Sequence, residues 1–85
     1  MIVHNAADLG RLIRQRREEV GLTTTQAAQM ARVSRRLLTE LEVGKRRNVG
    51  MSAALRILEL LGLKIEIERR GLPGTGARGS GGDRV

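Results

Sequence analysis

Two adjacent arginines near the middle of the chain begin a short stretch whose residue types are suited to nucleic-acid recognition. At helical spacing, polar side chains occupy one side of this stretch and leucines occupy another. The polar positions are Arg35, Arg36, Thr39 and Glu40, and the apolar positions are Leu38 and Leu41. A guanidinium group presents a planar pair of N–H donors that fits phosphate oxygens and the O6 and N7 atoms of guanine. The pattern predicts a helix with a buried apolar side and an exposed basic side.

The residues around this helix carry the signals that would hold it in place. Thr23 is expected to cap one short helix, and Gln26 completes a capping box three residues later. Ser34 is expected to cap the second helix, and Gly44 is suited to the left-handed conformation that ends it. The first helix has a small-residue face made of Ala27, Ala28 and Ala31. Two such helices joined by a tight turn form a helix-turn-helix unit, whose second helix enters the DNA major groove.

This segment resembles the Xre/Cro-type helix-turn-helix family in its cap, small crossing residue, turn and stop. The matching residues are Gly21-Leu22-Thr23, Ala28, Met30-Ala31, Val33-Ser34 and Leu41-Glu42-Val43-Gly44-Lys45. Two positions depart from the family pattern. Thr24 replaces a Gln that often touches a phosphate, and Arg32 replaces the glycine of the turn. A non-glycine residue in the left-handed conformation is strained by about 1 kcal/mol or more.

The resemblance implies roles for individual side chains. The positions that match base-reading sites of the family are Arg35, Arg36, Leu37 and Glu40. The expected phosphate contacts are Thr24, Ser34, Thr39, Lys45, Arg46 and Arg47, with a merely polar loop as the alternative for the last three. Arginine is expected to fork to guanine, Glu40 to accept from a cytosine amine, and Leu37 to touch a thymine methyl. A two-fold dimer would place two reading helices about 34 Å apart, so an inverted-repeat operator is expected.

Composition narrows the function classes further. The 85 residues carry a net charge of +7, with fourteen Arg and two Lys, and contain no Cys and no aromatic residue. The basic balance favours a nucleic-acid partner, although a solvated basic surface is the alternative. Lack of aromatic stacking platforms weakens an RNA-binding role. Because no paired acids, histidine cluster or nucleophile constellation is present, we expect neither an enzyme nor a cofactor.

A membrane role is not expected either. No apolar run approaches the roughly 18 residues of a membrane span, and no signal-peptide pattern begins the chain. The absence of Cys fits a reducing compartment. We therefore expect a cytoplasmic protein.

Helices are expected on both sides of the helix-turn-helix unit. The first follows Asp8 and ends at Gly21, and its arginines are interpreted as a mostly solvated face, with Arg14 pairing with Glu18. The last is expected to be capped by Ser52 or Gly50 and to run to about Leu61, with Gly62 closing it. Its expected core stripe is Met51, Ala54, Leu55, Leu58 and Leu61. Ile57 and Leu60 lie off that stripe, so they either cover the first helix or face a second subunit.

The segment 63–69 changes from helical to alternating periodicity, which predicts a β-strand. A single strand needs a partner, and the simplest one is the same strand of a second copy, with residues 1–3 as a weaker rival. The expected dimer interface is Ile57, Leu60, Leu63, Ile65 and Ile67. The predicted fold is mainly α: a four- to five-helix bundle like that of the Xre and lambda repressors, plus this strand.

A four-helix domain followed by this strand resembles the HipB-type antitoxins over about residues 8 to 69. The resemblance implies an autoregulating, dimeric DNA-binding repressor that also binds a HipA-type kinase toxin. A stand-alone repressor is the alternative, as is a protein-binding module in which DNA binding is secondary. Residues 1–69 are expected to form the domain, and the Gly-rich residues 70–85 a disordered tail.

Overall fold

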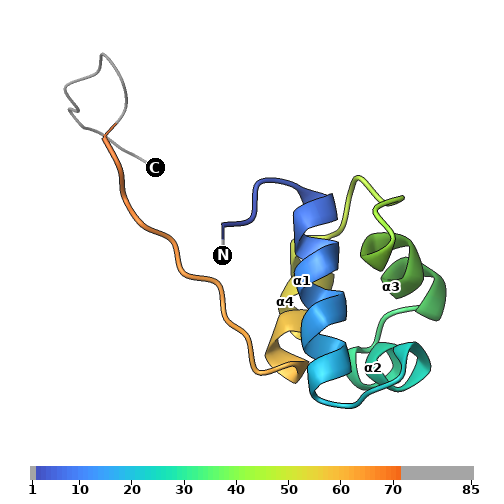
Figure 1. Ribbon diagram of the computed structural model, residues 1–85. Coiled ribbons are helices and arrows are strands. Elements are labelled where there is room, and N and C mark those ends of the chain that lie inside the picture. Colours follow the sequence, from blue (N-terminus) through green and yellow to red (C-terminus); the bar gives the residue numbers. More distant parts are fainter. Residues whose placement is uncertain (1, 72–85) are drawn as a thin grey trace.

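The computed structural model describes residues 2–71, which form four helices and connecting loops. They are α1 (Ala6–Glu19), α2 (Thr24–Ala31), α3 (Arg35–Glu42) and α4 (Met51–Leu60). Helix α3 packs against α1 and α2, and α2 also packs against α4 (Figure 1). The mainly helical prediction is confirmed, with four helices in the described part of the chain. None of them is long and apolar enough to cross a membrane.

The starts of α2 and α3 follow the predicted capping signals. The Thr23 hydroxyl accepts from the backbone N–H of Gln26 at 3.0 Å, and the Gln26 side chain accepts from the Thr23 N–H at 2.9 Å. Ser34 caps α3 through a 2.9 Å bond from the N–H of Leu37. The cap of α1 is Asn5 rather than Asp8, since the Asn5 side chain accepts from the Asp8 N–H at 2.8 Å. Local chemistry therefore fixes where these helices begin.

The core is small and aliphatic, and every helix contributes to it. The buried apolar residues of its main cluster are Ile13, Ala27, Ala28, Ala31, Leu38, Leu41, Ile57, Leu58 and Leu61. The three alanines of α2 are almost fully buried, as expected for a face that other helices approach closely. Leu38 and Leu41 hold α3 on this core, so the opposite side of α3 faces solvent.

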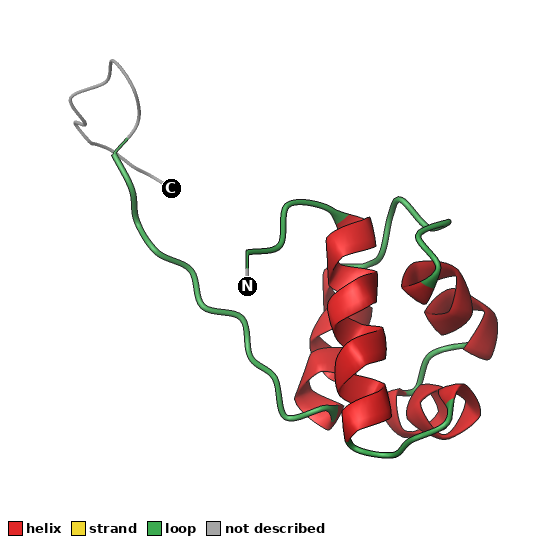
Figure 2. Cartoon of the chain, viewed as in Figure 1, coloured by secondary structure: helices red, strands yellow, loops and turns green. Residues whose placement is uncertain are grey.

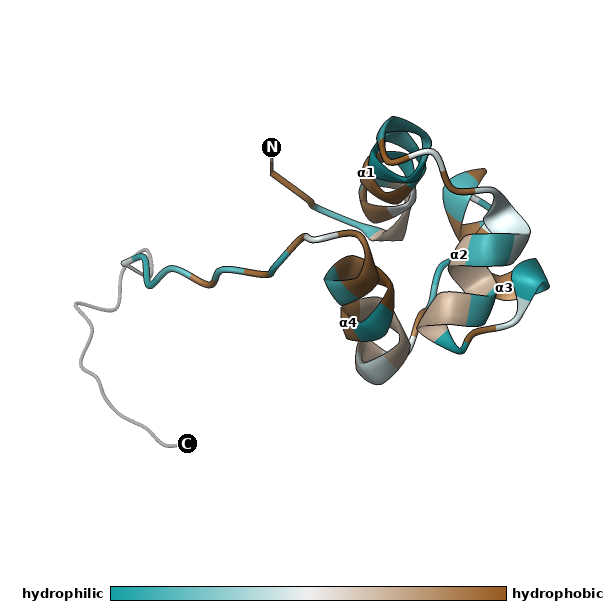
Figure 3. Ribbon diagram, turned by 90° about the horizontal axis from the view of Figure 1, so that it is seen from below, coloured by the Kyte–Doolittle hydropathy of each residue, from teal (hydrophilic) through white to brown (hydrophobic). Residues whose placement is uncertain are grey.

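The buried side of α4 differs from the prediction. Ile57, expected at a dimer interface, is fully buried in the core, whereas Met51 and Leu55, expected in the core, are 66% and 45% exposed. Leu60 is partly buried against the core cluster. Helix α4 is apolar around most of its circumference, as its colouring in Figure 3 shows, so periodicity alone did not determine which side packs inward. Packing against α2 decides it.

The crossing of α1 and α3 depends on a glycine. Gly10 is buried in the middle of α1, and a Cβ built on it would lie 1.8 Å from the Leu41 carbonyl oxygen and 3.2 Å from the Glu42 Cα. These are backbone atoms that a rotamer change cannot move aside. The backbones of α1 and α3 therefore approach as closely as they do only because position 10 has no side chain.

A buried ion pair ties the same two helices together. The Glu42 carboxylate accepts from Arg17 Nε at 2.8 Å and Arg17 Nη2 at 2.9 Å. Arg17 also donates from Nη1 to the Leu22 carbonyl at 2.9 Å. The hydrogen bond that Arg17 donates to Glu42 raises the pKa of Arg17 above its ordinary value despite burial. Arg17 is therefore an exception to the mostly solvated arginine face expected for this helix, whereas the predicted Arg14–Glu18 surface pair is confirmed at 3.3 Å.

Two further arginines bond to the carboxyl ends of helices. Arg16 Nε donates to the Leu61 carbonyl at 2.9 Å, which connects α1 to the end of α4. Arg56 of α4 donates to the carbonyls of Ala31 at 2.9 Å and Arg32 at 3.3 Å, where α2 ends. Both satisfy carbonyls that the helix itself leaves unpaired and complement the helix dipole. Part of the arginine excess is thus structural rather than a nucleic-acid footprint.

The turn between α2 and α3 contains the strained arginine that the sequence predicted. Arg32 has φ 60° and ψ 43°, and it is the only non-glycine residue with positive φ in the described part of the chain. We expect Arg32→Gly to raise the free energy of unfolding by about 1 kcal/mol, because glycine adopts this conformation without Cβ strain. Arg32→Ala, which keeps the strain and removes the exposed side chain, serves as the control in parallel urea denaturation. Equal stability of the two variants would contradict this explanation.

The carboxyl-terminal segment 63–71 leaves the bundle as an extended chain (Figure 1). No strand is assigned anywhere in residues 2–71, and Figure 2 draws this segment as loop. Leu63 packs partly against the core, but Ile65 is 46% and Ile67 is 92% exposed. Pairing between two copies therefore stays a prediction. Most of the tail expected to be disordered lies outside the described residues.

Candidate nucleic-acid interface

The exposed side of α3 presents the arginines that the sequence singled out. Arg35 and Arg36 occupy its first two positions, and the Arg36 side chain is 85% exposed. Thr39 is also exposed on this helix. Ser34, just before α3, uses its hydroxyl oxygen as a cap, which leaves its O–H free to donate to another group. These side chains rest on a helix whose other side is fixed in the core.

Glu40 connects α3 to the loop that follows it. Its Oε2 accepts from Arg36 Nε and its Oε1 accepts from Arg46 Nη1, both at 2.9 Å. Arg46 also donates from Nε to the Asn48 carbonyl at 3.2 Å. One carboxylate therefore holds two guanidinium groups, one from the expected base-reading set and one from the expected phosphate-binding set.

The ion pairs of Glu40 predict a pH dependence of stability. Arg36 first, and then Arg46, lower the pKa of Glu40 below its ordinary value of 4.5 by hydrogen bonding to the ionised form. A depressed folded-state pKa means that the stabilisation is fully present above 4.5 and is lost as pH falls through the folded value. We expect the stability difference between wild type and Glu40→Gln to be constant from about pH 6 to pH 5 and to shrink as the pH falls from about 4.5 to 3. A difference that stayed constant in urea denaturation over this range would contradict the assignment.

Two other predicted contacts are less exposed than the arginines. Leu37 is partly buried and packs against the core cluster, so only part of its side chain is available to a thymine methyl. Thr24, the first residue of α2, is also only partly exposed. Both lie at the start of their helices, and their contact roles stay predictions.

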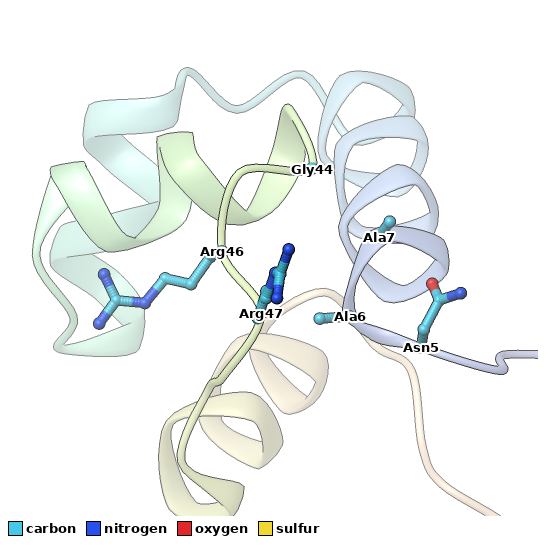
Figure 4. Close-up of a pocket in the computed structure, with 6 residues that line it drawn as sticks. All are labelled: Asn5, Ala6, Ala7, Gly44, Arg46 and Arg47. Atoms are coloured by element: carbon cyan, nitrogen blue, oxygen red, sulfur yellow. The ribbon is translucent and has the colours of Figure 1, made fainter.

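The basic loop after α3 runs past the amino-terminal end of α1. Lys45 and Arg47 are exposed, whereas Arg46 is partly buried and bonds to Glu40. A shallow pocket lies here, lined by Asn5, Ala6, Ala7, Gly44, Arg46 and Arg47. In Figure 4 the Arg47 side chain lies toward the start of α1, and Arg46 extends away from it. The exposed Arg47 favours phosphate at this edge of the molecule, although Asp8 in the first turn of α1 offsets the positive end of that helix.

Helices α2 and α3 and the capped turn between them form a helix-turn-helix unit. The exposed side of α3, its second helix, is free to enter the major groove of DNA. The chain belongs to the helix-turn-helix domain family, whose sequence model matches residues 8–72. A search of curated proteins gives no significant match. Membership of this family supports a DNA-binding regulator, which agrees with the general class that the sequence predicted.

Sequence reasoning missed the residues that hold α3 against α1. Glu42 lies four residues after Leu38 and next to Leu41, which places it on the buried side of α3. A glutamate at a buried position is a signal for a buried ion pair. Gly10 lies three residues before Ile13 on the apolar side of α1, which is the position where a glycine permits close approach. Neither residue reveals in the sequence what it contacts, because Arg17 and Leu41, their respective partners, lie on another helix.

Proposed function

We propose that the protein is a sequence-specific, double-stranded DNA-binding transcriptional repressor that acts as a homodimer. The observation that carries the proposal is the exposed basic side of α3, where Arg35 and Arg36 stand at the amino-terminal end of a helix anchored by Leu38 and Leu41. The amino-terminal residues of a recognition helix are those that contact base edges. The adjacent basic loop, with Lys45 and Arg47, is suited to the flanking phosphates.

Dimerisation through the carboxyl-terminal segment is supported by its exposed apolar residues. Ile65 and Ile67 alternate with charged residues on an extended segment that has no pairing partner within residues 2–71. An extended, half-apolar segment with unpaired backbone groups can form a strand with another chain. A second copy supplies the same strand with two-fold symmetry, and that symmetry predicts an inverted-repeat operator.

Two single substitutions test the division between base and phosphate contacts. Arg36→Ala is expected to cost about 1–3 kcal/mol of binding free energy at one base pair of each half-site and to relax specificity there. Arg47→Ala is expected to weaken binding to all sequences alike and to reduce the salt slope of log K by about 1. Titration of operator variants at two salt concentrations measures both. Indistinguishable behaviour of the two variants would contradict the division.

Selection from random duplex DNA tests the proposal as a whole. The purified chain should enrich a symmetric motif, with two half-sites separated by about one or two helical turns. Enrichment of a single half-site would support DNA reading but not the dimer. Failure to enrich any duplex motif at low salt would overturn the proposal.

The likeness to HipB-type antitoxins adds a partner to this proposal. We propose that the repressor also binds a HipA-like kinase toxin and regulates its own operon, with a stand-alone repressor as the alternative. Support comes from the sequence alone, in the extended segment that follows α4. Co-expression with a kinase-like protein encoded beside it, followed by isolation of a stable complex, separates the two possibilities.

A further inference from the structure

We propose that Glu40 is a positioning residue that orients Arg36 for guanine and links it to Arg46, rather than a residue that reads a base itself. This inference rests on the proposed DNA-binding function. It starts from the two oxygen atoms of one carboxylate. Oε2 is occupied by Arg36 and Oε1 by Arg46, each at 2.9 Å.

The contact with Arg36 leaves a defined set of donors free. Glu40 engages the Nε atom of Arg36, so both terminal Nη atoms remain available on a side chain that is 85% exposed. Two terminal Nη donors suffice for a bidentate contact with guanine O6 and N7. The i, i+4 spacing of Arg36 and Glu40 on one helix holds this orientation before DNA arrives. Preorganisation lowers the conformational entropy that Arg36 loses on binding.

The contact with Arg46 joins base recognition to the backbone-binding loop. Arg46 donates Nη1 to Glu40 and Nε to the Asn48 carbonyl, which fixes the loop relative to α3. Its Nη2 remains for a phosphate oxygen. A displacement of the loop would therefore change the direction of the Arg36 side chain through the shared carboxylate. Base and phosphate contacts are expected to be energetically coupled.

The charge of Glu40 has a second consequence for specificity. A carboxylate near the DNA opposes binding to any phosphate backbone and attracts the arginine that would otherwise form nonspecific phosphate contacts. Removing the negative charge should therefore tighten nonspecific binding while weakening discrimination. Opposite changes of these two quantities distinguish a positioning carboxylate from one that only stabilises the fold, whose loss would weaken both.

The test compares Glu40→Gln with Glu59→Gln in the full chain. Glu59 is exposed on α4, and its side chain forms no hydrogen bond or ion pair within the described residues, so the control removes the same charge elsewhere. Affinities are measured for the selected operator, for each single base-pair variant and for random duplex DNA. Glu40→Gln should lower discrimination at the Arg36-dependent base pair by about 2- to 12-fold, less than the loss expected for Arg36→Ala. Its affinity for random DNA should rise about two- to fivefold. Glu59→Gln should leave discrimination unchanged.

Each other outcome overturns the inference. Altered preference at a base pair that Arg36→Ala leaves unaffected would make Glu40 a base reader. Equal loss on operator and random DNA would make its role purely structural, and circular dichroism of the variant would show whether the helices persist. Additive effects of Arg36→Ala and Arg46→Ala in wild type would remove the proposed coupling. If wild type itself selects no duplex motif, the proposed function fails, and that result is separate from all of these.

Discussion

Replacing Glu42 by Gln is expected to lower the free energy of unfolding by about 3–5 kcal/mol, the typical cost of removing one partner of a buried ion pair. The substitution keeps the side-chain shape but removes the charge that accepts from Arg17 Nε and Nη2. Both side chains are largely buried, with the Glu42 side chain 5% exposed, so water cannot replace the lost bonds. The charge of Arg17 would then remain buried without its counter-ion.

Glu18→Gln is the matched control for this variant. Glu18 pairs with Arg14 on the surface at 3.3 Å, with both side chains 56% exposed. Such pairs contribute about 0.3–0.5 kcal/mol when they are four residues apart on a helix. Urea denaturation followed by far-UV circular dichroism gives both values. Similar losses in Glu42→Gln and Glu18→Gln would mean that the buried pair does not hold α1 on α3.

Gly10→Ala is expected to lower the free energy of unfolding by about 3 kcal/mol or more. This equals or exceeds the largest typical cost of adding a methyl-sized group to a packed interior. Helix propensity alone predicts the opposite sign, since alanine is favoured over glycine by about 1 kcal/mol within a helix. The new Cβ would lie 1.8 Å from the Leu41 carbonyl oxygen, so α1 and α3 would have to separate. Separation would also lengthen the hydrogen bonds between Arg17 and Glu42.

The control for Gly10→Ala is Gly71→Ala, where an added Cβ meets no other atom of residues 2–71 within 4 Å beyond its chain neighbours. We expect its midpoint in thermal or urea denaturation to match that of wild type within the error of the measurement. Gly10→Ala should instead show a lower midpoint and, because α3 is displaced, weaker operator binding. A stability gain in Gly10→Ala would show that the two backbones are not in the close contact described here.

The helix-turn-helix unit could be predicted from sequence because its signals are local. The Thr23 capping box, the Ser34 cap and the left-handed Gly44 each act within a few residues, and all three are found as predicted. The exposed arginines of α3 followed from the same reasoning, because Leu38 and Leu41 fix which side of the helix turns inward. The predicted contacts with DNA themselves stay predictions.

Other features depend on which residues meet across helices, and tertiary structure decided them. Helix α4 carries apolar residues on most sides, so two different stripes fit its periodicity, and only packing against α2 buries Ile57 rather than Met51. Arg17 and Glu42 are 25 residues apart, so the sequence does not show that these two charges pair with each other. By itself the sequence determined where α2 and α3 begin and end and which side of α3 is exposed, because those depend on hydrogen bonds and spacing within one segment. The pairing of charges and the rotation of α4 required three-dimensional proximity, since their energies come from partners that are distant along the chain.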